Sequence, residues 1–396
     1  MSAPEKFITA EAAAEALEIS RATLYAYVSR GLIETSGTGD DPRRKLYSVH
    51  DVEALKKRKS VGRRPREVAA TTLDWGLPVL SSGITLIDHS RLYYRGRDAA
   101  QLADSASLED VARLLWNCGD DDPFADDKAS PDPFDARSLE QLMRLPLTER
   151  CQTLLPFVTQ GRATAWKRDP RRLWPGACAL LRSLTAACLG RQPDKRPTHA
   201  FLANAWALDD AGADIVRRAL VLLADHELNA SAFAVRVVAS TGASLSACLN
   251  AGLSALSGPM HGGTTSLVEL LFDELDRTGD AATVIENRLR RGDDVPGFDH
   301  PLYPQGDPRA ASLLPFLPAD AAQSDLLAVM NDTAGKLPNC DFALVALRRA
   351  LGLPQGSALA LFAIGRTAGW IAHALEQMQD DKLIRPRARY TGSAIG

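Results

Sequence analysis

Apolar residues recur every three or four positions over most of the chain, and this spacing predicts amphipathic helices. Strand-like alternation is short and scarce. Glycine and proline mark the interruptions, above all in the Gly-Pro-Met-His-Gly-Gly run at Gly258–Gly263. We expect one helix to end near Leu256 and another to begin at Thr264. His261 would then lie beside free helical N–H groups, which favour a neutral imidazole. The pattern predicts a mainly α protein.

Residues 1–66 follow a separate pattern. Thr9 is expected to cap a helix at 10–17, and Ser20 to cap a second helix at 21–30. A three-residue turn separates the two predicted helices. Two short helices joined in this way have the size of a helix-turn-helix unit.

The segments after the second helix predict a small β wing. Leu32–Ile33 and Lys45–Tyr47 are expected to pair across a Gly- and Pro-containing turn. Ser48 starts a predicted third helix at 49–57. Residues 1–66 carry thirteen basic and nine acidic groups, whereas the whole chain has a net charge of −3. This basic excess would attract phosphates.

The middle of the chain mixes short strands with helices. Strand-like runs at 73–78, 84–88 and 92–98 precede a helix that Ser107 caps. The acidic segment Asp120–Pro133 lacks the ligand spacing of a calcium loop, so we interpret it as a solvated loop and predict no metal site. The helices of 139–224 are expected to break at prolines, namely Pro146, Pro156, Pro170, Pro175 and Pro197.

Length and composition are those of a soluble globular protein. A chain of 396 residues is long enough for two or three domains. No run of about 18 apolar residues predicts a membrane span, and the polar N-terminus has no signal-peptide pattern. The six cysteines are scattered, which indicates reduced core residues and neither a disulfide framework nor a zinc site. We therefore expect a cytoplasmic protein.

Histidine, aspartate and arginine residues concentrate in predicted loops and helix ends of the second half. The segments are 225–231, 258–263, 295–300, 307–309, 338–341, 362–370 and 385–392. An aspartate removes a proton α to a carbonyl. Neutral histidines donate hydrogen bonds to an enolate or a ketone, and arginines bind carboxylates bidentately. This combination suits carbon–carbon bond formation on a polycarboxylate.

Residues 1–66 resemble the winged helix-turn-helix family of MerR and excisionase-like proteins. The resemblance lies in Thr9–Ala13, Ser20–Tyr25 and Tyr47–Val52. It implies DNA binding through residues of the second helix, namely Arg21, Thr23, Tyr25 and Arg30. The alternative is a protein-docking helical module followed by a solvated basic linker.

Over roughly residues 70–396 the motifs come in the order and at the separations of the citrate synthase family, which this region resembles. The resemblance implies that His261 binds the thioester oxygen of acyl-CoA, that His300 polarises the oxaloacetate ketone, and that Asp341 is the catalytic base. It assigns oxaloacetate binding to His226, Arg309, Arg366 and Arg385, the last from a neighbouring subunit. It assigns an acyl-CoA loop to Val295, Pro296, Gly297 and Phe298.

The resemblance also implies the architecture. The large helical domain would comprise 67–261 and 347–396, and the small domain 262–346 would close over the substrates and exclude water. The helix-turn-helix domain of 1–66 would precede them. The family implies a homodimer, with the CoA thioester as a substrate and no further cofactor.

Two positions depart from the family pattern. Asp299 stands before His300 where the family usually has glycine, and we expect its carboxylate to raise the pKa of that histidine. Pro304 replaces a basic residue that contacts CoA phosphates in the family. The oxaloacetate side is therefore expected to be intact and the CoA side altered.

Two functions remain at this stage. The first is an acyltransferase that condenses acetyl-CoA, or a short acyl-CoA such as propionyl-CoA, with oxaloacetate to give citrate or 2-methylcitrate. The second is a DNA-binding transcription regulator whose synthase-like domain senses oxaloacetate, citrate or acyl-CoA. The complete set of catalytic residues favours the enzyme, whereas Asp299, Pro304 and the N-terminal module favour the sensor.

Overall fold

The computed structural model describes residues 7–393, except 18, 30–32, 34, 39–40, 54, 56–78, 126–135, 159–168, 381 and 389. The chain forms two compact units, residues 1–81 and residues 82–396. Each unit has its own hydrophobic core. The predicted boundary at residue 66 lies outside the described residues and stays a prediction.

The N-terminal unit contains two helices and a small antiparallel sheet. Its elements are β1 (Phe7–Ile8), α1 (Ala10–Ala16), α2 (Arg21–Ser29), β2 (Thr35–Thr38) and β3 (Asp41–Ser48), with strand order β1-β3-β2. The Thr9 hydroxyl accepts the Ala12 N–H at 3.3 Å, and the Ser20 hydroxyl accepts the Thr23 N–H at 3.2 Å. Both predicted helix starts are therefore confirmed.

The predicted wing is right in its second strand and wrong in its first. Thr35–Thr38 pairs with β3, whereas Ile33 is 2% exposed and packs in the core of the unit. Burial of the apolar Ile33 side chain favours its position in the core. The polar Thr-Ser-Gly-Thr run forms the hairpin with β3 instead. Residues 49–53 are helical as predicted, and the Ser48 hydroxyl accepts the Asp51 N–H at 3.3 Å.

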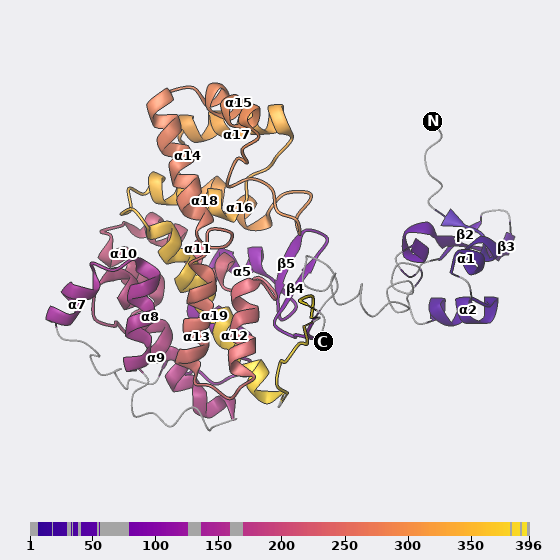
Figure 1. Ribbon diagram of the computed structural model, residues 1–396, viewed down its shortest axis with the longest axis horizontal. Coiled ribbons are helices and arrows are strands. Elements are labelled where there is room, and N and C mark those ends of the chain that lie inside the picture. Colours follow the sequence, from indigo (N-terminus) through magenta and orange to yellow (C-terminus); the bar gives the residue numbers. More distant parts are fainter. Residues whose placement is uncertain are drawn as a thin grey trace. The chain divides into compact units, whose positions relative to one another are not determined.

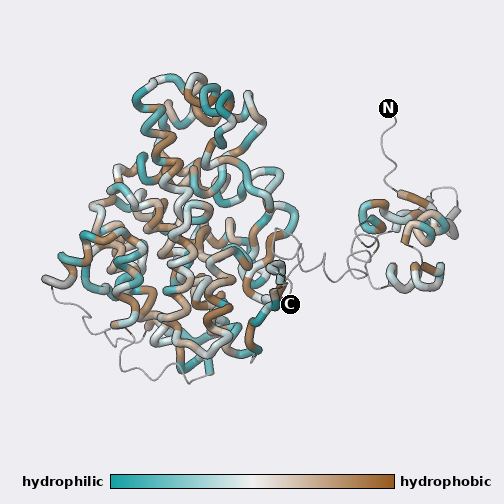
Figure 2. The backbone as a smooth tube through the Cα atoms, viewed as in Figure 1, coloured by the Kyte–Doolittle hydropathy of each residue, from teal (hydrophilic) through white to brown (hydrophobic). Residues whose placement is uncertain are grey.

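The mainly helical class is confirmed for the second unit. Its helices are α5 (Ala99–Ser105), α6 (Leu108–Leu115), α7 (Ala136–Leu142), α8 (Leu147–Val158), α9 (Pro170–Leu189), α10 (Thr198–Ala205), α11 (Asp210–Leu223), α12 (Ala230–Ala239), α13 (Leu245–Leu256), α14 (Thr264–Thr278), α15 (Ala281–Arg291), α16 (Pro308–Leu313), the 3₁₀ turn η1 (Leu314–Phe316), α17 (Ala321–Ala334), α18 (Cys340–Ala350) and α19 (Ser357–Gln379). Hydrophobic and hydrophilic residues alternate along the outer helices (Figure 2).

A three-stranded antiparallel sheet precedes these helices. Its strands are β4 (Thr85–Asp88), β5 (Arg91–Tyr94) and β6 (Arg97–Asp98), in that order. The buried Tyr94 hydroxyl donates to the carbonyl oxygens of Val221 at 3.1 Å and Leu222 at 3.0 Å. The sheet is thereby fixed to the C-terminal end of α11. The predicted strand at 73–78 lies outside the described residues.

Two prolines that were expected to break helices lie inside them. Pro156 is in α8 and Pro175 is in α9. A proline leaves the carbonyl four residues earlier without its helical partner. For Pro156 that carbonyl belongs to Gln152, and the Asn250 side chain donates to it at 3.3 Å. A residue of α13 therefore replaces the missing bond, which the local sequence of α8 does not reveal.

Helix α19 forms the centre of the second unit and packs against α11, α12 and α13 (Figure 1). Within the described part of the chain it is the one helix long and apolar enough to cross a membrane, and 94% of its apolar window is buried in this fold. The apolar side chains of α19 thus supply the core.

Helices α14, α15 and α17 lie together at one end of this unit, at the top of Figure 1. Helices α16 and α18 connect them to the rest. Residues 82–396 nevertheless form one compact unit. The predicted small domain at 262–346 covers this group of helices, and its closing motion stays a prediction.

Candidate active site

His261 lies in the tight turn between α13 and α14, where the sequence predicted it. The carbonyl of Gly258 accepts the N–H groups of His261 at 3.0 Å and Gly263 at 3.1 Å. A Cβ atom on Gly262 would lie 2.6 Å from the Leu256 carbonyl oxygen, so the turn requires glycine at this position. The turn therefore fixes the backbone from which the His261 ring projects.

The His261 ring is held from one side by a hydroxyl group. Its Nε2 atom lies 2.8 Å from Ser231 Oγ, which also accepts the Trp370 indole N–H at 3.1 Å. Ser231 Oγ lies 2.7 Å from Asn229 Oδ1 as well, so its single hydrogen serves either the amide or the imidazole. Burial, with the charge of Arg366, lowers the pKa of His261 to about 4. His261 is therefore neutral at physiological pH.

His226 follows the end of α11, in one of the segments that were predicted as loops and helix ends. Glu227, the next residue, adopts a left-handed backbone conformation (φ 53°) that a right-handed helix does not contain. The His226 side chain is buried, and its Nε2 lies 2.8 Å from the Tyr303 hydroxyl. Burial, together with the charges of Arg309 and Arg366, holds the pKa of His226 well below its usual range.

His300 packs against both of these rings. Its ring centroid lies 5.1 Å from that of His226 and 5.0 Å from that of Tyr303. His300 Nδ1 accepts the Leu302 N–H at 3.2 Å, so a neutral ring carries its hydrogen on Nε2.

The expectation that Asp299 raises the pKa of His300 is wrong. Burial and the positive charge of Arg309 lower that pKa to about 4, against a smaller opposing effect of Asp307. The Asp299 side chain is exposed, and its carboxylate lies 3.8 Å from the Lys336 ammonium. Solvent and a cation therefore screen the carboxylate that was expected to act on the histidine.

Arg309 is buried and paired with a carboxylate. Its Nε and Nη2 atoms donate to the two oxygens of Asp307 at 2.9 and 2.7 Å. Asp307 also caps α16 by accepting the Arg309 backbone N–H at 2.9 Å, and it accepts the Cys340 N–H at 2.9 Å. One aspartate thus orients Arg309 and joins it to the start of α18.

Arg366 lies in the middle of α19 and is 1% exposed. Its Nε donates to the Leu223 carbonyl at 3.0 Å, whereas its Nη2 is buried without a hydrogen-bond partner among the described residues. Gly365 lets α11 approach, because a Cβ there would lie 2.8 Å from Leu223 Cβ. The unpaired N–H groups leave Arg366 able to bind an anion.

Asp341 is the second residue of α18, and Asn339 caps that helix. Its Oδ1 atom is buried and has no hydrogen-bond partner among the described residues. Burial raises the pKa of Asp341 to about 7, although Arg309 acts in the opposite direction. A carboxyl group with this pKa exchanges protons readily at neutral pH.

The predicted acyl-CoA loop is fixed along its backbone. Asn339 N–H donates to the Gly297 carbonyl at 2.9 Å, and Asp299 N–H donates to the Leu337 carbonyl at 2.8 Å. The side chains of Val295 and Phe298 are buried in the core, and Pro296 is half-buried. The side chains of Val295 and Phe298 therefore support the loop and do not present it to a ligand. Pro304, farther along the loop, is exposed.

The other predicted site residues lie apart from this cluster. Arg385 is exposed and makes no hydrogen bond or ion pair with the described residues of its own chain. In the N-terminal unit Arg21 pairs with Glu11, Thr23 bonds to Ser20, and Tyr25 is 55% exposed. The side chain of the remaining predicted DNA contact, Arg30, lies outside the described residues.

The sequence analysis missed Tyr303, Ser231 and the buried pair Asp225–His373. Asp225 Oδ1 lies 3.3 Å from His373 Nε2, and Asp225 Oδ2 accepts the Thr85 hydroxyl at 2.6 Å. Ser231 lies in the segment 225–231 that was predicted to carry site residues, and its polar side chain at a helix start was the available signal. The partner of Asp225 is 148 residues away, so no local pattern predicts it.

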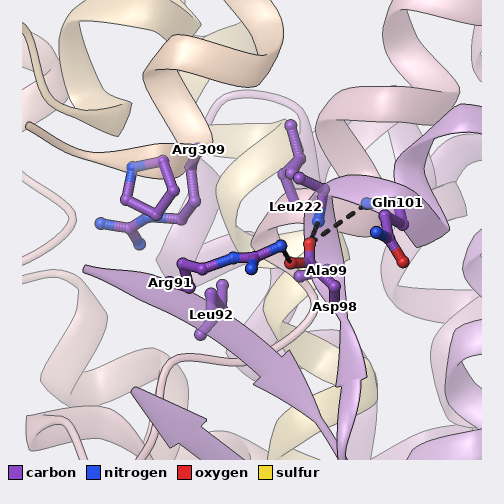
Figure 3. A pocket seen from close by; sticks show the side chains of 9 residues that line it. Arg91, Leu92, Asp98, Ala99, Gln101, Leu222 and Arg309 are labelled. Atoms are coloured by element: carbon purple, nitrogen blue, oxygen red, sulfur yellow. Dashed lines mark hydrogen bonds and ion pairs between the residues drawn. The ribbon is translucent and has the colours of Figure 1, made fainter. Parts of the chain in front are cut away.

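A cavity of about 140 Å³ adjoins Arg309 on the side of β5 and α5. Its charged residues already have partners: Arg91 bonds to Asp98 (Figure 3) at 2.5 Å, and Arg309 bonds to Asp307. The described residues include no group of three or more His, Cys, Asp or Glu side chains arranged to hold a metal ion. The chemistry therefore concentrates at the histidine cluster.

The cluster combines three functions among buried and half-buried side chains. His226, His261 and His300 are neutral and can donate hydrogen bonds. Asp341 can accept a proton at neutral pH. Arg309 and Arg366 offer positive charge to an anion. This combination can remove a proton α to a carbonyl and stabilise the enolate beside an anionic second substrate.

The family profile "Citrate synthase, C-terminal domain" matches residues 72–387. A citrate synthase of Haloferax volcanii is 31% identical over 358 residues, covering 80% of this chain and 94% of the relative. 2-methylcitrate synthase 1 of Corynebacterium glutamicum is 28% identical over 77% of this chain and 90% of its own length. The crystal structure of citrate synthase from Thermotoga maritima superposes with a TM-score of 0.65 at 27% identity, covering 81% of this chain and 95% of that one.

Proposed function

The chain belongs to the citrate synthase family, and from this membership we propose that it condenses a short acyl-CoA with oxaloacetate and releases free CoA. It is an enzyme of the citrate synthase type. The observation that carries the proposal is the environment of Asp341, whose carboxyl has a buried Oδ1 without a partner among the described residues and a pKa of about 7, and which is influenced by two buried arginines. The CoA thioester is a substrate, and we propose no further cofactor.

Enolisation is the first step. The Asp341 carboxylate accepts a proton from the carbon α to the thioester carbonyl, and negative charge develops on the carbonyl oxygen. His261 donates a hydrogen bond to that oxygen from Nδ1. This requires the Ser231 hydroxyl to donate its hydrogen to His261 Nε2, which lies 2.8 Å away. The same hydroxyl lies 2.7 Å from Asn229 Oδ1, which can only accept, so this step requires the Ser231 hydrogen to turn from the amide oxygen to the imidazole.

Condensation is the second step. The nucleophilic carbon forms a bond to the ketone carbon of oxaloacetate as the C=O π bond breaks, and the His300 Nε2–H hydrogen-bonds the developing alkoxide. That oxygen takes up one proton, which balances the proton that Asp341 removed. Arg309, Arg366 and His226 bind the oxaloacetate carboxylates before this step. Water then hydrolyses the thioester bond, which gives the tricarboxylic acid and free CoA.

The acyl donor is acetyl-CoA or propionyl-CoA. Both possibilities are kept because one relative above is named a citrate synthase and the other a 2-methylcitrate synthase. We propose that the loop from Val295 to Phe298 lines the path of acyl-CoA with its backbone. Release of free thiol from each donor, with and without oxaloacetate, tests the function. Oxaloacetate-dependent thiol release supports it, whereas release that ignores oxaloacetate indicates a thioesterase and contradicts it.

We propose further that the enzyme is a homodimer in which Arg385 completes the site of the partner subunit. The exposed position of Arg385, which has no hydrogen bond or ion pair with the described residues of its own chain, supports this. The test mixes two inactive variants, Arg385→Ala and Asp341→Asn. In a mixed dimer one site would have both Asp341 and Arg385 intact, so activity should return on mixing. If mixed dimers form and remain inactive, Arg385 acts within its own chain or has no role.

We propose that the N-terminal unit binds DNA. Its support is the pair of capped helices followed by a β hairpin, with Tyr25 exposed on α2. Affinity should fall steeply with salt, because Lys and Arg contacts displace counterions. Arg21→Ala should weaken specific binding more than non-specific binding. Ligand-responsive DNA binding without condensation would indicate the sensor, and absence of salt-dependent binding would leave a protein-docking module.

A further inference from the structure

Tyr303 contacts both histidines assigned to oxaloacetate, although the condensation requires no phenol. Its hydroxyl lies 2.8 Å from His226 Nε2, and its ring centroid lies 5.0 Å from that of His300. The Arg309 guanidinium carbon lies 5.6 Å from the same ring centroid. Tyr303 is 2% exposed, so its side chain is enclosed by these three residues and their surroundings.

The backbone places Tyr303 and His300 on one turn. The Tyr303 N–H donates to the His300 carbonyl at 2.8 Å, and the Leu302 N–H donates to His300 Nδ1. His226 comes from a different segment, directly after α11. The hydroxyl of Tyr303 therefore joins the turn that carries one histidine to the segment that carries the other.

The chemistry of the two groups sets the direction of this hydrogen bond. A phenol is a strong neutral donor, and an unprotonated imidazole nitrogen is a better acceptor than a phenol oxygen. Burial raises the pKa of Tyr303, so its proton stays on the oxygen at neutral pH. His226 is neutral for the reasons given above. A neutral imidazole that accepts at Nε2 carries its hydrogen on Nδ1.

We propose that Tyr303 is a positioning residue that fixes His226 as the Nδ1–H tautomer, which donates to a carboxylate oxygen of the bound 2-oxo acid. Among the described residues none hydrogen-bonds His226 Nδ1, so this N–H is available to a ligand. The opposite tautomer would point a lone pair at an anion. The inference rests on the proposed function for the identity of that ligand.

The test uses the full-length protein labelled with ¹⁵N in its seven histidines. Ring ¹⁵N shifts report the tautomer of each histidine, and a His226→Asn spectrum assigns the signal. In wild type we expect the Nδ1–H form of His226. In Tyr303→Phe, which keeps the ring, the signal should move toward the Nε2–H form. Tyr47→Phe is the matched control, since that tyrosine is 1% exposed but lies in the core of the N-terminal unit and should leave the tautomer unchanged.

Kinetics supply the second readout. Tyr303→Phe should raise the oxaloacetate KM about tenfold, the effect of one lost hydrogen bond to a charged ligand, and change the acyl-CoA KM less than twofold. An Nε2–H tautomer in wild type, no change of tautomer in Tyr303→Phe, or an equal rise of both KM values would overturn the proposal. The tautomer measurement requires no turnover. If the wild-type protein has no condensation activity, the proposed function is rejected, and the NMR spectra still decide whether Tyr303 fixes the tautomer of His226. If Tyr303→Phe does not fold, the wild-type tautomer decides.

Discussion

The two sides of the site are built differently. On the proposed oxaloacetate side, Arg309 and Arg366 are 3% and 1% exposed, and each donates to a group supplied by the core. On the proposed acyl-CoA side, Asp299 and Pro304 are exposed, and these are the positions that depart from the family pattern. A buried charge needs partners in fixed places, whereas an exposed loop residue does not. The comparison therefore predicts that substitutions on the oxaloacetate side change the kinetic constants strongly and for one substrate. Substitutions at the exposed positions of the acyl-CoA side should change them only slightly.

The base is the position where the largest effect is expected. Asp341→Asn should lower kcat by roughly 10²–10⁴-fold, because a positioned general base contributes about this much. Oxaloacetate binding, measured by calorimetry, should remain. The matched control is Asp299→Asn, which removes an exposed carboxylate and should change kcat less than twofold. A variant of Asp341 within a few-fold of wild type would reject its assignment as the base.

Replacing Arg366, whose Nη2 has no hydrogen-bond partner among the described residues, should have the next largest effect. Arg366→Gln should raise the oxaloacetate KM by roughly 10–100-fold, because it removes charge-assisted hydrogen bonds to a carboxylate. The acyl-CoA KM should change far less. Arg290→Gln, which removes an exposed and ion-paired guanidinium, is the control and should leave both values unchanged. An equal loss for both substrates would mean that Arg366 supports the fold and does not bind oxaloacetate.

The pH dependence of kcat/KM tests the protonation states of Asp341 and of the histidines together. Asp341 must be ionised to accept a proton, and its pKa is about 7, whereas those of His261 and His300 are about 4. Between pH 6 and 8 the histidines stay neutral while Asp341 loses its proton. The value of kcat/KM for acyl-CoA should therefore rise about tenfold with increasing pH over this range. A flat profile, or one that falls, would contradict the assigned protonation states.

The smallest effect is expected at the loop. Pro304→Arg should lower the acyl-CoA KM by about two- to fivefold, the usual strength of an exposed charge pair, and leave kcat unchanged. Pro318→Arg adds the same charge at another exposed proline and should not change KM. If Pro304→Arg changes kcat and not KM, the loop contacts something other than CoA.

Much of the site could be predicted because its chemistry is carried by short local motifs. The turn around His261 needs glycine for steric reasons, and Asp307 and Asn339 cap the helices that begin beside Arg309 and Asp341. Such signals are local, so the sequence contains them. The helix class and the boundaries of α13 and α14 follow from the same kind of signal.

The features that could not be predicted depend on residues far apart in the chain. Asn250 completes the hydrogen bonding of α8 after Pro156, and His373 lies against Asp225. Ile33 was predicted in a strand, but its side chain packs in a core formed by several other segments. The pKa of His300 was misjudged because the sequence shows the neighbouring Asp299 and does not show burial. Tertiary packing decides each of these, and periodicity does not report it.

The central claim is that one buried cluster forms a carbon–carbon bond between an acyl-CoA and oxaloacetate. Incubation with ¹³C-acetyl-CoA and oxaloacetate, followed by mass spectrometry of the products and a thiol assay, tests it most directly. The account predicts labelled citrate and free CoA in equal amounts from wild type, with propionyl-CoA giving 2-methylcitrate if it is the preferred donor. It predicts that Asp341→Asn forms both products roughly 10²–10⁴-fold more slowly. Free CoA with labelled acetate and no tricarboxylic acid, from either donor, would contradict it.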